Sequence, residues 1–288
     1  MKLKRYIPVF AALAGVVGAM LRGLNLHSGY EEGTGLPIPG NAPQTALIVL
    51  SVVMVALFYV LGHGFCRQRG ASFEDTFGCS STAYKTIAVL CGLAMGAAGA
   101  GGLYLLVTGT GTMTQNALEP QSSVLSTVLP LIPLWLLALL SMVAFILVAS
   151  VQARGTMTES HAALTLVPMF WACFDLIITF KDNGASPFVS LYAFELFAAI
   201  ALVFAFYSIA GFLYARSNPA RFVFATSLGV FFSWTCVGGY LVYGLLGGGA
   251  VTLTIEAVLR YVCFGAASVY LLANLILATR HLDYAPRH

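Results

Sequence analysis

The chain has 288 residues, of which 59% are hydrophobic and only 9% are charged, and its formal net charge is +3. A soluble domain carries about 25% charged residues, so this composition excludes a water-soluble fold. The cationic residues are spread along the chain, and no basic stretch is dense enough to indicate nucleic-acid binding.

Apolar runs of roughly 18 residues or more recur along the chain, and each is long enough to cross about 30 Å of hydrocarbon. Because backbone groups in lipid must be bonded within their own segment, each run is predicted to be a helix. The sequence therefore predicts an all-α, polytopic integral membrane bundle, with residues 1–288 in a single membrane domain. The eight expected spans are approximately 6–24, 43–63, 84–108, 124–151, 164–181, 187–215, 222–247 and 252–281.

The lysines and arginines are distributed unevenly across the predicted topology. Arg22, Lys181 and Arg260 fall on one side, and the other eleven fall on the opposite side or at its boundary. These eleven are Lys2, Lys4, Arg5, Arg67, Arg69, Lys85, Arg154, Arg216, Arg221, Arg280 and Arg287. By the positive-inside rule both termini are expected to be cytoplasmic. This asymmetry and the compact loops favour the plasma (inner) membrane of a bacterium.

The first span, "YIPVFAALAGVVGAML" after "MKLKR", has two interpretations. A secretory signal peptide would have the same charged start and apolar run, with Ala19 near its cleavage site. A permanent helix is favoured, because Ala11, Gly15 and Ala19 repeat every four residues and suit close packing on a neighbouring helix.

Packing also explains the small residues and cysteines elsewhere. In "GLAMGAAGAGG" of the third span, Gly92, Gly96 and Gly99 allow a neighbouring helix to approach at backbone distance. The six cysteines are interpreted as packing residues, since four lie inside spans and Cys66 and Cys79 lie on the predicted cytoplasmic side, where thiols stay reduced.

The prolines of the fourth span and the composition of three long loops give further predictions. Pro130 and Pro133 are expected to bend the fourth span. The long outer loops 25–42 and 109–123 are rich in turn-forming residues and are interpreted as connectors, with a lid over an outer cavity as the alternative. The inner loop 64–83 is polar with interspersed phenylalanines and is expected at the membrane interface.

The last four spans carry the most informative polar residues. Asp175 and Glu195 stand on either side of the short polar turn in "FDLIITFKDNGASPFVSLYAFELF". At ~1.5 Å per residue, Asp175 lies about 9 Å from the outer end of its helix and Glu195 about 12 Å from the outer end of the next. The two carboxylates are therefore expected at similar depth on antiparallel neighbours.

The final span carries a polar stripe with alternating spacings of four and three residues, and such a stripe is expected to face the bundle. Its members are Glu256, Arg260, Cys263, Ala267, Tyr270 and Asn274. Glu256 and Arg260 are one helical turn apart and are expected to pair. In the sixth span, Tyr192 shares a face with Glu195.

These positions predict one buried polar cluster of Asp175, Glu195, Glu256 and Arg260, with Arg22 as a candidate fifth member. A charge near the bilayer centre costs about 2.5–3.5 kcal/mol, so such a cluster favours a function over a salt bridge that only fixes packing. Three acids against two arginines leave one carboxylate without a partner, which suits a proton-coupled or cation-binding site.

Several chemistries lack the residues they require. The five histidines lie near or beyond span ends, so no histidine base is placed for intramembrane serine proteolysis. The sequence has no His-Glu-x-x-His zinc motif and no Gly-Lys pair of a phosphate-binding loop. The spacing of His63, Cys66 and Cys79 matches no familiar zinc site. No catalytic residue, metal or cofactor is therefore expected, and an enzyme is the third-ranked interpretation.

The sequence favours a permease-like protein that binds a small polar or cationic solute, or a proton, in an outward-facing cavity between the last four helices. The substrate-binding candidates are Asp175, Glu195, Glu256, Arg260, Tyr192 and Asn274. Asp175 and Glu195 would bind cargo or a proton, and Glu256 with Arg260 would form a switchable ion pair. The alternative is a non-transporting scaffold, sensor or assembly subunit, whose buried charges only fix helix packing. Its partners would be the lipid bilayer and a partner subunit or further copies in a homo-oligomer.

Overall fold

The computed structural model describes residues 2–31, 36–64, 72–79, 81–109, 129–155, 161–184, 189–214, 216–247 and 253–281. Within these ranges, eight helices are long and apolar enough to cross a membrane. They are α1 (Ile7–Ser28), α2 (Ala42–His63), α4 (Thr82–Thr108), α6 (Leu131–Arg154), α7 (Ala162–Asn183), α8 (Val189–Leu213), α9 (Pro219–Leu245) and α10 (Ile255–His281). The predicted all-α, polytopic class is confirmed, and the chain is a multi-pass membrane protein.

The long helices follow the predicted spans closely, except at the fourth. That span was expected from residue 124, but α6 begins at Leu131, and residues 124–128 lie outside the described part of the chain. Pro130 is the N-cap of α6 and Pro133 lies in its first turn, where a missing N–H removes no intrahelical bond. These two prolines therefore begin the helix instead of bending it. A proline does lie inside α7, at Pro168.

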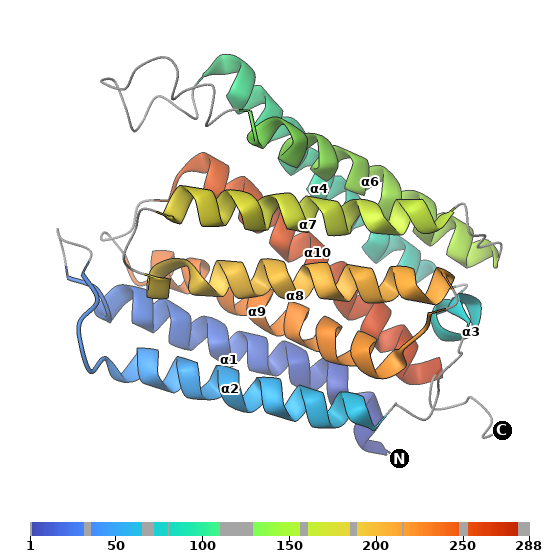
Figure 1. The fold of residues 1–288 in the computed structure, drawn as a ribbon, viewed down its shortest axis with the longest axis horizontal. Coiled ribbons are helices and arrows are strands. Elements are labelled where there is room, and N and C mark those ends of the chain that lie inside the picture. Colours follow the sequence, from blue (N-terminus) through green and yellow to red (C-terminus); the bar gives the residue numbers. More distant parts are fainter. Residues whose placement is uncertain are drawn as a thin grey trace.

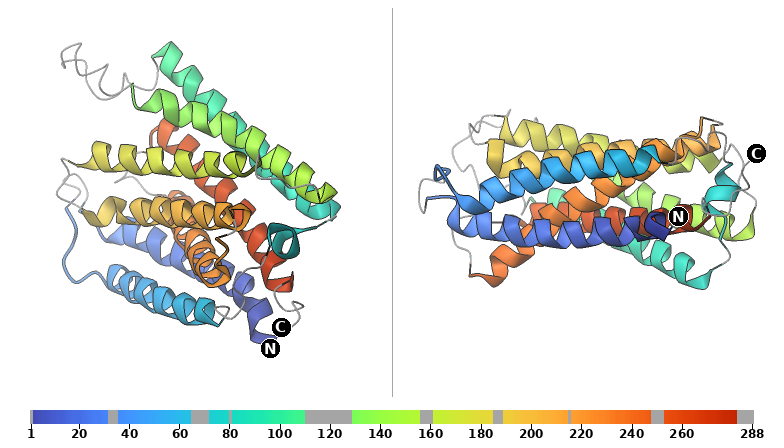
Figure 2. Two further views of the ribbon diagram at one scale, coloured as in Figure 1. Left: turned by 45° about the vertical axis from the view of Figure 1, so that its right-hand side comes forward. Right: turned by 90° about the horizontal axis from the view of Figure 1, so that it is seen from below.

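The long helices form a ring, and α1 and α2 pack against the outside of this ring at α9 (Figures 1 and 2). Successive neighbours in the ring are α9, α8, α7, α6, α4 and α10, and α10 returns to α9. Helix α1 packs mainly on α9, and α2 packs on α1 and α9 at the edge. Helix α1 begins and α10 ends on the same side of the bundle, the right in Figure 1, as an even number of spans requires. We call this the inner side, following the predicted orientation.

Small residues bring α1 and α9 together. A Cβ atom added to Gly15 would lie 2.8 Å from Cβ of Trp234, and one added to Gly238 would lie 2.6 Å from Cβ of Ala19. Real Cβ atoms do not approach this closely, so both positions require glycine or a shift of the helices. The predicted close packing of the first helix on a neighbour is confirmed.

The glycines of α4 play the same part against α6. A Cβ atom added to Gly99 would lie 3.0 Å from both the backbone nitrogen of Leu139 and the backbone oxygen of Trp135. One added to Gly92 would lie 3.1 Å from the backbone oxygen of Met142. The predicted approach of a helix at backbone distance is therefore also confirmed.

A short helix, α3 (Phe73–Phe77), lies at the inner end of the bundle (Figure 1). This helix was not predicted from the sequence, because residues 64–83 were expected to form a loop at the membrane interface. Ser72 caps it by accepting a hydrogen bond from the Asp75 amide at 3.1 Å. Phe77 is fully buried and makes edge-to-face contacts with Phe212 of α8 and Phe222 of α9, with ring centroids 5.2 and 5.1 Å away. Helix α3 is therefore docked into the bundle by its aromatic side chains.

Candidate functional site

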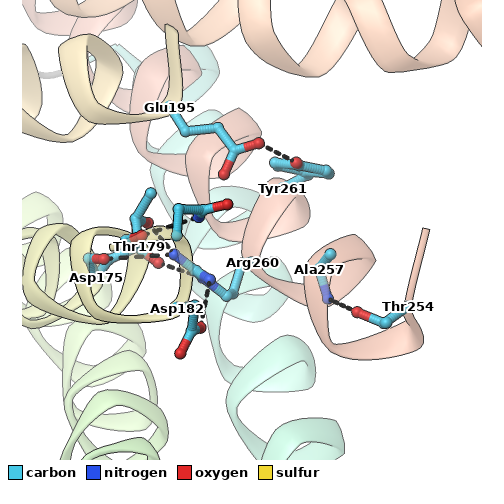
Figure 3. Close-up of polar contacts among 9 residues, drawn as sticks. Asp175, Thr179, Asp182, Glu195, Thr254, Ala257, Arg260 and Tyr261 are labelled. Atoms are coloured by element: carbon cyan, nitrogen blue, oxygen red, sulfur yellow. Dashed lines mark hydrogen bonds and ion pairs between the residues drawn. The ribbon is translucent and has the colours of Figure 1, made fainter. Parts of the chain in front are cut away.

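Asp175 of α7 and Arg260 of α10 form a buried ion pair in the outer half of the bundle. The guanidinium Nε donates to Asp175 Oδ1 at 2.7 Å, and the aspartate side chain has no exposed surface. Arg260 Nη2 also donates to the backbone oxygen of Asp175 at 3.3 Å and to the hydroxyl of Thr179. Figure 3 shows Arg260 reaching across from α10 to these groups. The ion pair therefore ties α7 to α10.

Arg260 has a second acidic neighbour on α7. Asp182 Oδ2 lies 3.9 Å from Arg260 Nη1, and the Asp182 side chain is 44% exposed. In the described structure no Glu256 oxygen lies within 4.0 Å of the Arg260 guanidinium, so the switchable pairing of these two residues stays a prediction. The long arginine side chain instead reaches the fully buried Asp175, which needs a counter-charge most.

Glu195 of α8 has a different environment. Its Oε1 accepts hydrogen bonds from the hydroxyl of Tyr240 on α9 at 3.0 Å and from that of Tyr261 on α10 at 2.6 Å. The two tyrosine rings stack with centroids 4.8 Å apart. Glu195 is only partly buried, and among the described residues no cationic group lies within ion-pair distance of it. In Figure 3 its carboxylate faces Tyr261.

Arg22 of α1 is buried without an acidic partner in the described part of the chain. Its Nη1 donates to Asn25 Oδ1 and to the backbone oxygen of Ser190, both at 3.2 Å, and its Nη2 donates to the backbone oxygen of Leu191. Its Cζ lies 5.2 Å from the centroid of the Phe194 ring, a cation–π contact. Neutral groups of α1 and the start of α8 therefore hold this charge.

Asn274 belongs to a separate polar cluster near the inner end. Its Oδ1 and the Oε1 of Gln152 lie 3.0 and 3.1 Å from the hydroxyl of Tyr84, whose single hydrogen the two oxygens share. The amide nitrogens of Asn274 and Gln152 donate to the backbone oxygens of Tyr270 and Phe77, respectively. At ~1.5 Å per residue, Asn274 lies about 21 Å along α10 from Arg260. Tyr192 is buried and makes no hydrogen bond to a described residue.

The inner cluster gives a first testable prediction. Replacing Tyr84 by phenylalanine is expected to lower the free energy of unfolding by about 1 kcal/mol, because two buried amide oxygens lose the one hydroxyl donor that they share. Thermal unfolding of the purified protein in detergent measures the loss. Tyr104→Phe is the matched control, since the Tyr104 side chain is 67% exposed and should leave the stability unchanged. Equal effects of the two variants would contradict a stabilising role for the Tyr84 hydroxyl.

The six predicted residues therefore fall into distinct groups. The structure joins Asp175 to Arg260 but gives Glu195 its own tyrosine partners and places Asn274 in the inner half. Sequence reasoning missed Gln152, Tyr84 and Asp182 as members of polar groups. An uncharged glutamine or tyrosine in a span gives little signal, and Asp182 lies next to the last residue of α7, where a charged residue is ordinary.

A small crevice lies between α6, α7, α8 and α10, next to the proline inside α7. Its volume open to a water-sized sphere is about 10 Å³, roughly the minimum for one water molecule. It is lined by Ala144, Phe145, Val148, Leu164, Thr165, Pro168, Phe206, Ile209 and Tyr270. None of the six candidate residues lines this crevice. Within the described ranges, no group of three or more His, Cys, Asp and Glu side chains is placed to hold a metal ion.

No protein-family model, curated protein or solved structure matches this chain.

Proposed function

We propose that this multi-pass membrane protein is permease-like and binds a small polar or cationic solute, or a proton, at Glu195 in the outer half of the bundle. The observation that supports this most directly is a carboxylate in a membrane span with two hydroxyl donors and no described cationic partner. Acids in spans are costly, and an acid in a span that has no cationic partner points to a functional site. Both tyrosines donate to Oε1 of Glu195, so its Oε2 can bind a cation transiently.

The proposal assigns the other acids a supporting role. Asp175 and Arg260 are held in a buried, multiply hydrogen-bonded pair, which fixes α7 against α10. Asp182, which is exposed, and Glu256, which is half-buried, add negative charge near the outer ends of the same helices. Such an excess of acid attracts cationic solutes toward the outer half. That Tyr192 lines the site stays a prediction, whereas Asn274 lies in the inner cluster with Tyr84 and is not part of the proposed site.

Neutralising Glu195 tests the proposal. In Glu195→Gln the amide oxygen still accepts from Tyr240 and Tyr261, so the melting temperature should be close to that of the unaltered protein. Uptake of radiolabelled primary amines and amino acids into proteoliposomes should fall about tenfold or more, because a charge-assisted bond is lost.

Glu74→Gln is the matched control, since Glu74 lies exposed in the first turn of α3. It should transport normally. Unchanged uptake in Glu195→Gln, with a protein of unaltered stability, would refute the assignment of Glu195.

A non-transporting scaffold or assembly subunit is the second candidate, and the burial of the Asp175–Arg260 pair favours it. Under this alternative no solute changes the stability of the protein, and no flux is measured for any variant. Disruption of the pair would instead alter the mass of the assembly, measured by light scattering in detergent.

A further inference from the structure

Two opposite charges in the outer half, Arg22 and Glu195, lie near each other without forming an ion pair. Arg22 donates only to neutral oxygens, of Asn25, Ser190 and Leu191. Glu195 accepts only from neutral hydroxyls. In the described structure each of these charges therefore lacks a counter-charge in contact.

Contacts on α8 and α9 place the guanidinium of Arg22 close to the helical turn that carries Glu195. In an α-helix the backbone oxygen of one residue faces the amide of the residue four positions later, so the Leu191 oxygen that accepts from Arg22 lies next to the backbone of Glu195. On α9, a Cβ atom added to Gly239 would lie 2.8 Å from the Cβ of Arg22, and the next residue, Tyr240, donates to Glu195. Both charges therefore lie at the junction of α8 and α9.

A buried donor beside Arg22 has no acceptor. Asn25 is 1% exposed, and its Nδ2 makes no hydrogen bond to a described residue, while its Oδ1 accepts from Arg22. Three N–H groups of the guanidinium are used in the bonds to Asn25, Ser190 and Leu191, and the others have no acceptor among the described residues. Arg22 and Asn25 thus retain unused donors, which is the requirement for binding a carboxylate.

We propose that these residues form a binding site for a zwitterionic solute of the α-amino-acid class. The carboxylate of the solute accepts from Arg22 and Asn25, and its ammonium group donates to the carboxylate of Glu195, beside the stacked rings of Tyr240 and Tyr261. The inference rests on the proposed function of Glu195 and adds the second charge that the solute must carry. Phe194, whose ring lies under the guanidinium, holds Arg22 toward α8.

Ligand-induced thermal stabilisation of the full-length protein in detergent tests the inference. The twenty proteinogenic amino acids are titrated first, and the tightest is then compared with its decarboxylated amine and its deaminated acid. For leucine these analogues are 3-methylbutylamine and 4-methylpentanoate. We expect the amino acid to bind at least about tenfold more tightly than either analogue, because each analogue loses one charge-assisted contact.

Two substitutions test which residue binds the carboxylate of the solute and which binds its ammonium group. Arg22→Gln should lower the affinity for the amino acid about tenfold or more and leave that for the amine unchanged. Glu195→Gln should lower the affinity for the amino acid equally and leave that for the acid unchanged. Arg221→Gln, at an exposed arginine that lies over the ring of Tyr207, is the control and should bind all three compounds normally.

The outcomes separate this inference from the proposed function. An amine that binds the unaltered protein as tightly as the amino acid would overturn the zwitterion site while leaving Glu195 as a cation site. Failure of both amines and amino acids to bind would overturn the zwitterion site and, with it, Glu195 as a site for cationic solutes. Because the comparison of compounds uses the unaltered protein, it does not depend on the folding of a variant.

Discussion

Replacing Asp175 by asparagine is expected to lower the free energy of unfolding by about 3–5 kcal/mol. The change leaves Arg260 buried beside a neutral amide, and an uncompensated buried charge is among the most destabilising defects in a protein. Chemical or thermal unfolding of the purified protein in detergent measures the loss.

Two further variants show whether pairing is the cause. Asp182→Asn should change the stability by less than about 1 kcal/mol, because that carboxylate is 3.9 Å from the guanidinium and 44% exposed. Combining Asp175→Leu with Arg260→Met should recover most of the loss, since replacing both members of a buried pair by apolar residues is often neutral. If Asp175→Asn alone were as stable as the unaltered protein, Asp175 would not be paired with Arg260 as described.

The second large effect is expected at the contact between α4 and α6. Gly99→Ala should destabilise the protein by about 1–3 kcal/mol, since the added methyl group would lie 3.0 Å from backbone atoms of Leu139 and Trp135. Backbone atoms cannot rotate away as a side chain can, so the two helices must separate.

Gly265→Ala is the matched control for this glycine. A Cβ atom at Gly265 of α10 would meet no atom within 4 Å, so the same substitution should be neutral or stabilise the helix by up to about 1 kcal/mol. The two alanine variants therefore differ in the sign of their effect. A stable Gly99→Ala protein would show that α4 and α6 are not in backbone contact.

The long helices could be predicted from the sequence because a membrane span requires a long apolar run and little else. The start of α6 was misplaced, since apolar residues precede Pro130 and hydropathy does not mark a cap. Helix α3 was missed for a physical reason as well. It has only five residues, too few to show a helical period, and its burial depends on phenylalanines of α8 and α9.

The candidate site was predictable in its residues and not in its pairing. Asp175, Glu195 and Arg260 were selected as candidates because they are charged residues within the outer halves of predicted spans. Glu256 was predicted to be the partner of Arg260 because the two residues are one helical turn apart. Such spacing predicts contacts within one helix and says nothing about contacts with other helices. Arginine reaches several ångströms to a neighbouring helix, so its partner depends on the crossing of α7 and α10, which the sequence does not encode locally.

The packing of α1 on α9 sets an order of events during synthesis. In the part of the chain that the structure describes, five membrane-spanning helices leave the ribosome between them, namely α2, α4, α6, α7 and α8. Until α8 and α9 arrive, the side chain of Arg22 has neither the carbonyl groups nor the glycine surface that bury it, and an arginine in bare lipid is costly. The first helix must therefore wait beside the insertion machinery or near the headgroups, and the bundle closes around it only when most of the chain has been made.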